Sequence, residues 1–327
     1  MSPRVALVTL GGTISMTKGA DNPGIVPTLG AKELAASLPD LGEVEVELHS
    51  LERVPSASLT TEVLLQVLAE CRAAVHAGAS GVVITQGTDT IDETSYFFDL
   101  LWDLPAPLIV TGAMRSPDEP GSDGPANMRD AILVAAEPAV REMGVLVVMA
   151  GEIHLARTVE KSHTSSICAF ASPGEGPVGH VVEGQLRLHY RPVEVFPSLP
   201  EPKGVFVPLI EAVLDDDGQL IEAALAGGAV ALVVAGSGAG HVSYGTRDRL
   251  AAALDRGIPV ILTSRTGSGS VLTRTYGYRG AEIDLLSLGV IPAGFLSGRK
   301  ARLLARVVLG SGGSVEDLRR EVLARGA

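Results

Sequence analysis

The strongest constraint on the fold is the alternation of short apolar runs with segments of helical periodicity. Runs such as Gly81–Thr85 and Val145–Met149 are rich in Val, Ile and Leu. This pattern is typical of strands that are buried on both faces of a parallel sheet. Only 4% of the residues are aromatic, so the core must be built largely from Val, Leu, Ile and Ala. We therefore predict an α/β fold in which helices cover both faces of a parallel sheet.

A break in composition divides the chain into two such patterns. The segment Tyr190–Pro202 contains four prolines and has no periodicity, which indicates a linker. A length of 327 residues also favours two domains over one. We predict a larger N-terminal α/β domain over residues 1–189, a linker over 190–204, and a smaller C-terminal α/β domain over 205–327.

Each domain has its own set of predicted elements. The N-terminal strands are Val5–Leu10, Val44–Leu48, Gly81–Thr85, Pro107–Thr111 and Val145–Met149, and the helices are Ala31–Ser37, Thr61–His76, Asp92–Leu101 and Pro125–Ala136. The C-terminal strands are Val205–Ile210, Val230–Ala235 and Val260–Thr263, and the helices are Gln219–Ala226, Thr246–Arg256, Gly298–Val308 and Val315–Ala324.

Small and hydroxyl-bearing residues follow several predicted strands, at the sheet edge where ligands bind in such folds. Gly12 and Thr13 follow the first strand, and Gly87, Thr88 and Asp89 follow the strand Gly81–Thr85. A threonine hydroxyl becomes a nucleophile when a base lies nearby, and Lys161, in a later polar stretch, is a candidate base. The alternative is structural: the threonines and Asp89 would cap helices, and Lys161 would be a solvated charge.

Charge and motif searches exclude several function classes. The net charge of −12 argues against a nucleic-acid partner, because proteins that bind nucleic acids normally present a basic surface. No apolar run reaches the roughly 18 residues of a membrane span, and the apolar run at the N-terminus is too short for a signal peptide. We therefore expect no membrane association, a cytoplasmic location, and free thiols at the only two cysteines, Cys71 and Cys168.

Motifs for nucleotide cofactors, for metals and for the serine nucleophile of α/β-hydrolases are missing or poorly placed. There is no P-loop, no Gly-x-Ser-x-Gly and no His-Glu-x-x-His. The segment Gly174–Gly179 matches Gly-x-Gly-x-x-Gly, but it contains a proline and does not connect a strand to a helix, so we do not interpret it as a dinucleotide site. We expect neither a metal nor an organic cofactor.

Four sequence blocks, taken together, resemble the bacterial-type L-asparaginases. The blocks occur in the family's order and are Thr9–Ile14 (with Leu10 where the family usually has Thr), Ile84–Thr90 followed by Glu93-Thr94, Val110–Arg115, and Lys161–Thr164 followed by Phe170 and Ser172-Pro173. The linker and the C-terminal domain also fit, so the resemblance covers essentially the whole chain. It implies hydrolysis of the side-chain amide of L-asparagine to L-aspartate and ammonia, without a cofactor.

The resemblance also implies roles for individual residues. Thr13 matches the primary nucleophile, and Thr88, Asp89 and Lys161 match a second catalytic cluster. The residues expected to bind substrate are Gly12, Ser56, Gly87, Thr88, Asp89 and Ala113. The family builds homotetramers from tight dimers, in which a neighbouring subunit completes each site. His241 falls near one of the contributed positions, and Tyr276 or Glu282 near the other.

Two positions depart from the secreted branch of the family, and the N-terminal loop, which lacks a Tyr, resembles the cytoplasmic branch more closely. Residues 15–30 contain no Tyr, and Ala57 follows Ser56 where secreted enzymes commonly carry Gln. One methylene changes selectivity by only about 10–200-fold, so a glutaminase-asparaginase or a D-amino acid amide hydrolase remains an alternative. An amidohydrolase for glutamine on charged tRNA would need an extra domain and a basic surface, and the acidic net charge of the chain disfavours this alternative. The alternative outside enzymes is a non-catalytic amino-acid-binding protein with the same fold.

Overall fold

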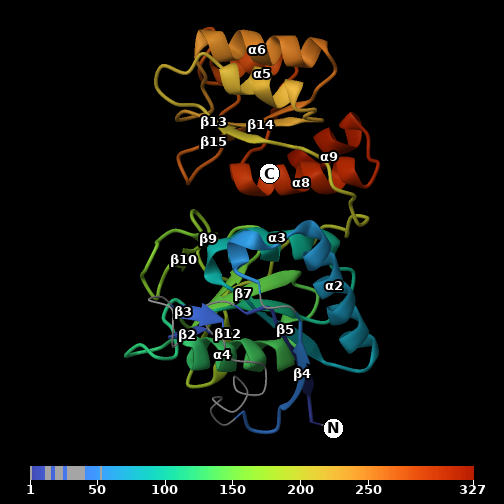
Figure 1. Ribbon diagram of the computed structural model, residues 1–327, viewed down its shortest axis with the longest axis vertical. Helices are drawn as coiled ribbons and strands as arrows, with labels where there is room; N and C mark the ends of the chain where they lie inside the picture. Colours follow the sequence, from blue (N-terminus) through green and yellow to red (C-terminus); the bar gives the residue numbers. More distant parts are fainter. Residues whose placement is uncertain (1, 12–15, 19–24, 28–40, 52–53) are drawn as a thin grey trace. The chain divides into compact units, whose positions relative to one another are not determined.

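The computed structural model describes residues 2–11, 16–18, 25–27, 41–51 and 54–327. The chain forms two compact units, Met1–Ser198 and Leu199–Ala327, and the division falls within the proline-rich segment 190–204. Each unit has a β-sheet with helices on both faces (Figure 1). The predicted α/β fold class is therefore confirmed.

The N-terminal sheet has eight strands and is mixed, whereas we predicted a parallel sheet. Its spatial order is β12 (Gln185–Leu188), β11 (Gly179–Val182), β8 (Glu152–Leu155), β7 (Val145–Met149), β6 (Leu108–Thr111), β5 (Gly81–Thr85), β1 (Arg4–Thr9) and β4 (Glu45–Ser50). Neighbouring strands are parallel through the series β4, β1, β5, β6 and β7, and β8, β11 and β12 add an antiparallel edge. The chain reverses between β7 and β8 at Ala150 (φ 52°) and Gly151 (φ 78°), a turn with two positive φ angles that suits a hairpin.

In the described part of the N-terminal unit, three helices cover this sheet. They are α2 (Thr61–His76), α3 (Ile91–Leu101) and α4 (Gly124–Ala136). Helices α2 and α3 lie on one face and α4 lies on the other (Figure 1). Helix α2 begins at Thr61 because the side chain of Thr60 accepts the backbone N–H of Val63, which satisfies one of the donors left unpaired at a helix start.

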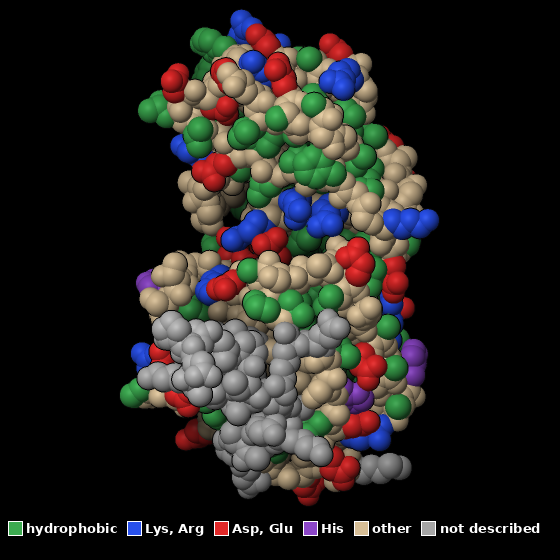
Figure 2. Space-filling view, in the orientation of Figure 1, with side chains coloured by type: hydrophobic (Ala, Val, Ile, Leu, Met, Phe, Trp, Pro, Cys, Tyr) green, Lys and Arg blue, Asp and Glu red, His purple; other side chains and the backbone are tan. Residues whose placement is uncertain are grey.

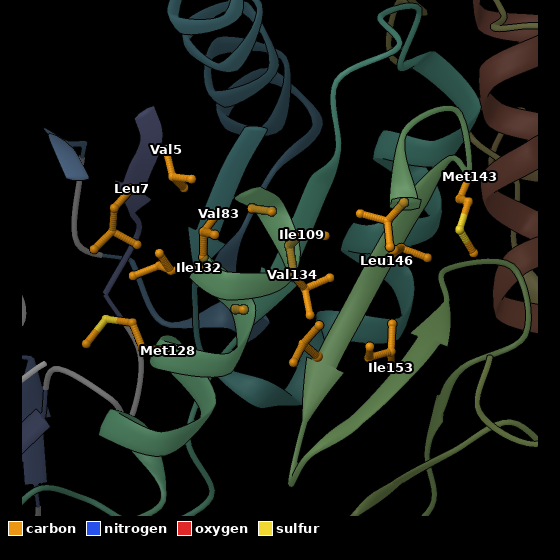
Figure 3. Close-up of a cluster of buried hydrophobic side chains, with 14 of the residues drawn as sticks. Val5, Leu7, Val83, Ile109, Met128, Ile132, Val134, Met143, Leu146 and Ile153 are labelled. Atoms are coloured by element: carbon orange, nitrogen blue, oxygen red, sulfur yellow. The ribbon is translucent and has the colours of Figure 1, made fainter. Parts of the chain in front are cut away.

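The core beneath α4 is a cluster of aliphatic side chains from adjacent strands and the helix. Figure 3 labels members of this cluster from the strands and from α4: Val5, Leu7, Val83, Ile109, Leu146, Met128, Ile132 and Val134. All of these side chains are buried. Burial of this kind contributes roughly 1.5–3 kcal/mol to folding stability per large aliphatic side chain, so the cluster stabilises the packing of α4 on the strands.

The predicted N-terminal elements match the structure to within two residues at each end wherever the residues are described. The predicted helix Ala31–Ser37 lies outside the described residues. Short elements were not anticipated: β2 (Met16–Lys18), β3 (Ile25–Pro27), η2 (Ser56–Ser58), η3 (Thr88–Thr90), η4 (Pro138–Val140), β9 (Glu160–Lys161) and β10 (Phe170–Ala171). Strands β9 and β10 pair with each other in a separate antiparallel sheet.

The C-terminal unit contains a parallel sheet of four strands. The strand order is β13 (Leu209–Glu211), β14 (Leu232–Gly236), β15 (Val260–Ser264) and β16 (Ile291–Pro292). Its helices are α5 (Gln219–Ala226), α6 (Tyr244–Asp255), α7 (Glu282–Ser287), α8 (Gly298–Gly310) and α9 (Val315–Arg325). Helices α5 and α6 cover one face, and α8 and α9 lie on the other (Figure 1).

The first predicted strand of this unit is displaced. We predicted Val205–Ile210, whereas β13 spans Leu209–Glu211. Pro208 has no N–H to donate to a ladder, although the carbonyls of Phe206 and Pro208 still accept the backbone N–H groups of Val230 and Val233, at 3.0 and 3.1 Å. The extended segment is therefore longer than the regular strand.

The surface carries charges of both signs. Acidic side chains are interspersed with Lys and Arg on the face shown in Figure 2. In the part of the chain that the structure describes, no helix is both long and apolar enough to cross a membrane.

Candidate active site

Three parallel strands end side by side at one edge of the N-terminal sheet. Thr9, Thr85 and Thr111 are the last residues of β1, β5 and β6, and they are in register across the three strands. The backbone N–H of Leu10 donates to the carbonyl of Thr85 (2.9 Å), and the N–H of Gln86 donates to the carbonyl of Thr111 (3.1 Å). The loops that follow these strands therefore begin at the same carboxyl edge, where parallel sheets bind ligands.

A lysine, a threonine and an aspartate meet at this edge. Lys161 Nζ donates hydrogen bonds to Thr88 Oγ1 (2.9 Å) and to Asp89 Oδ1 (2.7 Å). The Lys161 side chain is only 12% exposed, whereas the Asp89 side chain is 72% exposed, and Thr88 is buried. The lysine is thus shielded from solvent on the threonine side and open toward Asp89.

Thr88 is held against the loop that follows β6. A β-carbon placed on Gly112 would lie 3.1 Å from Thr88 Cγ2 and 2.7 Å from the carbonyl oxygen of Gln86. Only glycine therefore allows this close approach of the two loops. The side-chain amide of Gln86 is buried and donates to Thr94 Oγ1 (3.2 Å) on α3, which supports the loop from below.

Ser56 and Gly87 lie against each other. A β-carbon on Gly87 would approach Ser56 Oγ to 2.7 Å. Ser56 is buried at the start of η2, and its carbonyl accepts the Thr90 hydroxyl (3.2 Å). Ser56, one of the residues expected to bind substrate, therefore lies directly beside the turn that carries Thr88 and Asp89.

Of the remaining N-terminal candidates, Ala113 lies within the described residues. Ala113 is buried in the loop after β6, and the preceding carbonyl, of Gly112, accepts the Asn127 amide (3.0 Å). Gly12 and Thr13 lie outside the described residues.

The three candidates in the C-terminal unit are in contact with one another. His241 Nε2 lies 3.1 Å from Glu282 Oε2, and the ring centroids of His241 and Tyr276 are 4.9 Å apart. Glu282 Oε1 accepts the backbone N–H groups of Thr275 (2.9 Å) and Tyr276 (2.7 Å). Sequence reasoning missed a fourth member, Tyr278, whose hydroxyl lies 2.8 Å from His241 Nδ1.

Glu282 keeps its charge although it is fully buried. Burial by itself raises the pKa of this carboxyl, but the hydrogen bonds from the Tyr276, Glu282 and Thr275 N–H groups and from His241 outweigh it and leave the pKa below its usual value. Hydrogen bonds to the charged form lower a carboxyl pKa in this way. The cluster therefore presents a fixed negative charge behind a histidine and two partly exposed tyrosines.

Within the described residues, no group of three or more His, Cys, Asp or Glu side chains is arranged to hold a metal ion. The chemistry that the Thr88–Asp89–Lys161 arrangement supports is proton transfer at a hydroxyl. A lysine amine in contact with a buried threonine can take up or return its proton, and an exposed carboxylate beside them can bind a cationic group of a ligand.

Comparison with known families covers nearly the whole chain. A family model described as "Asparaginase, N-terminal" matches residues 4–194, and one described as "Glutaminase/Asparaginase C-terminal domain" matches residues 206–321. The resemblance drawn from the four sequence blocks is therefore confirmed.

Individual relatives agree with the family models. The chain is 37% identical to a "Probable L-asparaginase" of Deinococcus radiodurans, over 97% of this chain and 96% of that protein. It is 32% identical to an "L-asparaginase" of Bacillus licheniformis, over 95% and 97%. The crystal structure of a "Probable Cytoplasmic L-asparaginase" from Campylobacter jejuni superposes with a TM-score of 0.87 at 27% identity, covering 98% of this chain and 99% of that one. The chain belongs to the asparaginase family over essentially its whole length.

Proposed function

We propose that this protein is an L-asparaginase, an amidohydrolase that converts L-asparagine and water to L-aspartate and ammonia. The observation that carries the proposal is the contact of Lys161 Nζ with both Thr88 Oγ1 and Asp89 Oδ1 at the carboxyl edge of the sheet. Family membership and relatives named L-asparaginase support the same reaction.

The first step forms an acyl-enzyme. Thr13 Oγ attacks the side-chain amide carbon of asparagine and its proton passes to the amide nitrogen. The C–N bond then breaks, ammonia leaves, and the aspartyl group remains bound to Thr13 as an ester. Backbone N–H groups near Gly12 and Thr88 would stabilise the oxyanion that forms on the carbonyl oxygen.

The second step hydrolyses that ester. A water molecule attacks the ester carbon, and the proton that it loses moves through the Thr88 hydroxyl to the amine of Lys161. Collapse of the tetrahedral intermediate breaks the bond to Thr13 Oγ, which recovers a proton from the same relay. Aspartate is released and all groups return to their starting protonation states.

Substrate recognition follows from the groups at the same edge. Ser56 would bind the α-carboxylate, and Asp89, with its exposed carboxylate, would bind the α-ammonium. Gly12 and Gly87 would let the substrate approach the backbone, and the carbonyl of Ala113 would accept the side-chain amide N–H.

We further propose that a second copy of this chain contributes His241, Tyr276 and Glu282, so that the active form is a homodimer or homotetramer. The contacts among these three residues support one shared role. A cytoplasmic location completes the proposal, in line with the similar Campylobacter jejuni structure.

The test is ammonia release from the purified protein with L-asparagine, L-glutamine and D-asparagine in parallel. We expect release from L-asparagine well above the other two, and none from Thr13→Ala, whose circular dichroism should match the wild type. Comparable release from glutamine or D-asparagine would indicate a broader amidohydrolase. Binding of asparagine without release would indicate a non-catalytic binding protein. Analytical ultracentrifugation tests the assembly, and a monomer with full activity would overturn it.

A further inference from the structure

A buried carboxylate outside the predicted site contacts the backbone of Lys161. Asp92 is the second residue of α3 and is only 1% exposed. Its Oδ1 accepts the backbone N–H of Glu93 (3.1 Å), and its Oδ2 accepts the backbone N–H of Lys161 (3.3 Å). Asp92 lies three residues beyond Asp89, so one short stretch of chain contacts both ends of the same lysine.

The geometry of the short strand β9 explains why the backbone N–H of Lys161 donates to a side chain and not to the neighbouring strand. β9 pairs with β10 along one edge, and the N–H of Ser162 points to that edge and donates to the Ala169 carbonyl (2.7 Å). Successive residues of a strand direct their N–H groups to opposite edges. The N–H of Lys161 therefore points away from β10, toward α3, where Asp92 accepts it.

The hydrogen bond fixes the origin of a long side chain. The Lys161 ammonium reaches Thr88 and Asp89 through a four-carbon stem, and lysine loses more rotamer freedom than most residues when it is ordered. A displacement of about 1 Å at a catalytic group can cost on the order of 100-fold in rate. The position of the backbone from which the stem starts is therefore as important as the contacts at its tip.

We propose that Asp92 is a positioning residue of the active site: its carboxylate holds the main chain of Lys161 at the start of α3, so that the ammonium reaches Thr88 Oγ1. The inference rests on the proposed function only for the reaction that is measured. Asp92 does not contact the substrate in this assignment and acts through Lys161 alone.

A purely structural role for Asp92 would be stabilisation of α3, because a negative charge near a helix N-terminus is favourable by roughly 0.3–1 kcal/mol. The same helix provides a matched control. Asp99 Oδ1 accepts the backbone N–H of Val145 (2.9 Å), which is the same type of contact between α3 and a strand. Asp99→Asn therefore perturbs the helix and an anchored strand without touching Lys161.

The first experiment compares kcat and KM for L-asparagine in Asp92→Asn and Asp99→Asn. Displacement of Lys161 should lower kcat of Asp92→Asn by at least about tenfold and change KM by less than about threefold, whereas Asp99→Asn should keep kcat within about twofold of the wild type. If Asp92→Asn does not fold, Asp92→Ser removes the same carboxylate and should show the same split. Equal losses of kcat in the Asp92 and Asp99 variants would overturn the proposal.

A double-mutant cycle separates action through Lys161 from a general effect. In a Lys161→Met background, Asp92→Asn should change the residual turnover by less than about twofold, because its target is already absent. Independent effects that multiply would contradict the assignment.

Backbone amide exchange tests the same contact without any substrate. Exchange at the Lys161 amide should accelerate in Asp92→Asn relative to both the wild type and Asp99→Asn, and unchanged exchange would overturn the proposal. If the wild type hydrolyses none of the amides, the proposed function fails, while exchange still decides whether Asp92 anchors Lys161.

Discussion

Replacement of Lys161 by methionine removes the ammonium and keeps a stem of nearly the same length. The variant loses the hydrogen bonds to Thr88 Oγ1 and Asp89 Oδ1. Because the Asp89 side chain is 72% exposed, its ion pair with Lys161 contributes at most about 1 kcal/mol to stability. We therefore expect the free energy of unfolding to change by less than about 2 kcal/mol, since the apolar stem still packs.

The effect on turnover should be much larger. Loss of a general acid–base group costs about 10²–10⁴-fold in rate, which corresponds to about 3–5 kcal/mol in activation free energy. We expect kcat for L-asparagine to fall by this factor in Lys161→Met. Lys161→Arg keeps the positive charge, but a guanidinium stays protonated in proteins, so it should not restore activity.

The assay is steady-state ammonia release at saturating asparagine, with thermal unfolding of each variant as a check on folding. Lys203→Met is the control, because Lys203 is an exposed lysine in the C-terminal unit, and it should retain full turnover. Near-normal kcat in Lys161→Arg would refute the reasoning, because the charge alone would then account for the role of the lysine.

Three further outcomes follow from the geometry. Gly87→Ala would put a β-carbon 2.7 Å from Ser56 Oγ, so we expect KM for asparagine to rise roughly tenfold as the serine shifts. Gly81→Ala would put a β-carbon 2.2 Å from the backbone oxygen of Ala135 and should destabilise the protein by about 1–3 kcal/mol, measured by denaturant unfolding. Burial lowers the pKa of His154 below its unfolded value of 6.5. The unfolded chain therefore binds more protons just below pH 6.5, so stability should fall as the pH falls through that region, and His154→Gln should flatten the fall in Tm.

A matched control is available for the glycine variants. Gly204 has open space where a β-carbon would lie, so Gly204→Ala should leave both KM and stability unchanged. A Gly87→Ala enzyme with normal KM, a Gly81→Ala protein of normal stability, or a His154→Gln profile parallel to the wild type would each contradict the corresponding argument.

Much of the fold can be predicted from local sequence patterns. The apolar runs predicted β5 and β7 with the observed bounds, and the periodicity predicted α2 from Thr61 to His76. These elements can be predicted because hydrophobic periodicity and helix capping depend on residues that lie only a few positions apart in the chain. The mixed edge of the sheet was missed, because the direction of β8 depends on the two-residue turn at Ala150 and Gly151, and only one of these two residues is a glycine.

The fold class, the family blocks and the loops that follow the strand ends can all be predicted from the amino-acid sequence. The contact of Lys161 with Thr88, 73 residues away in the chain, emerges only from the folded chain. The same is true of the hydrogen bond from the Lys161 N–H to Asp92 and of the contact between Tyr278 and His241. Strand periodicity and turn chemistry are local, whereas these contacts require distant segments to be brought together by the packing of the sheet and its helices.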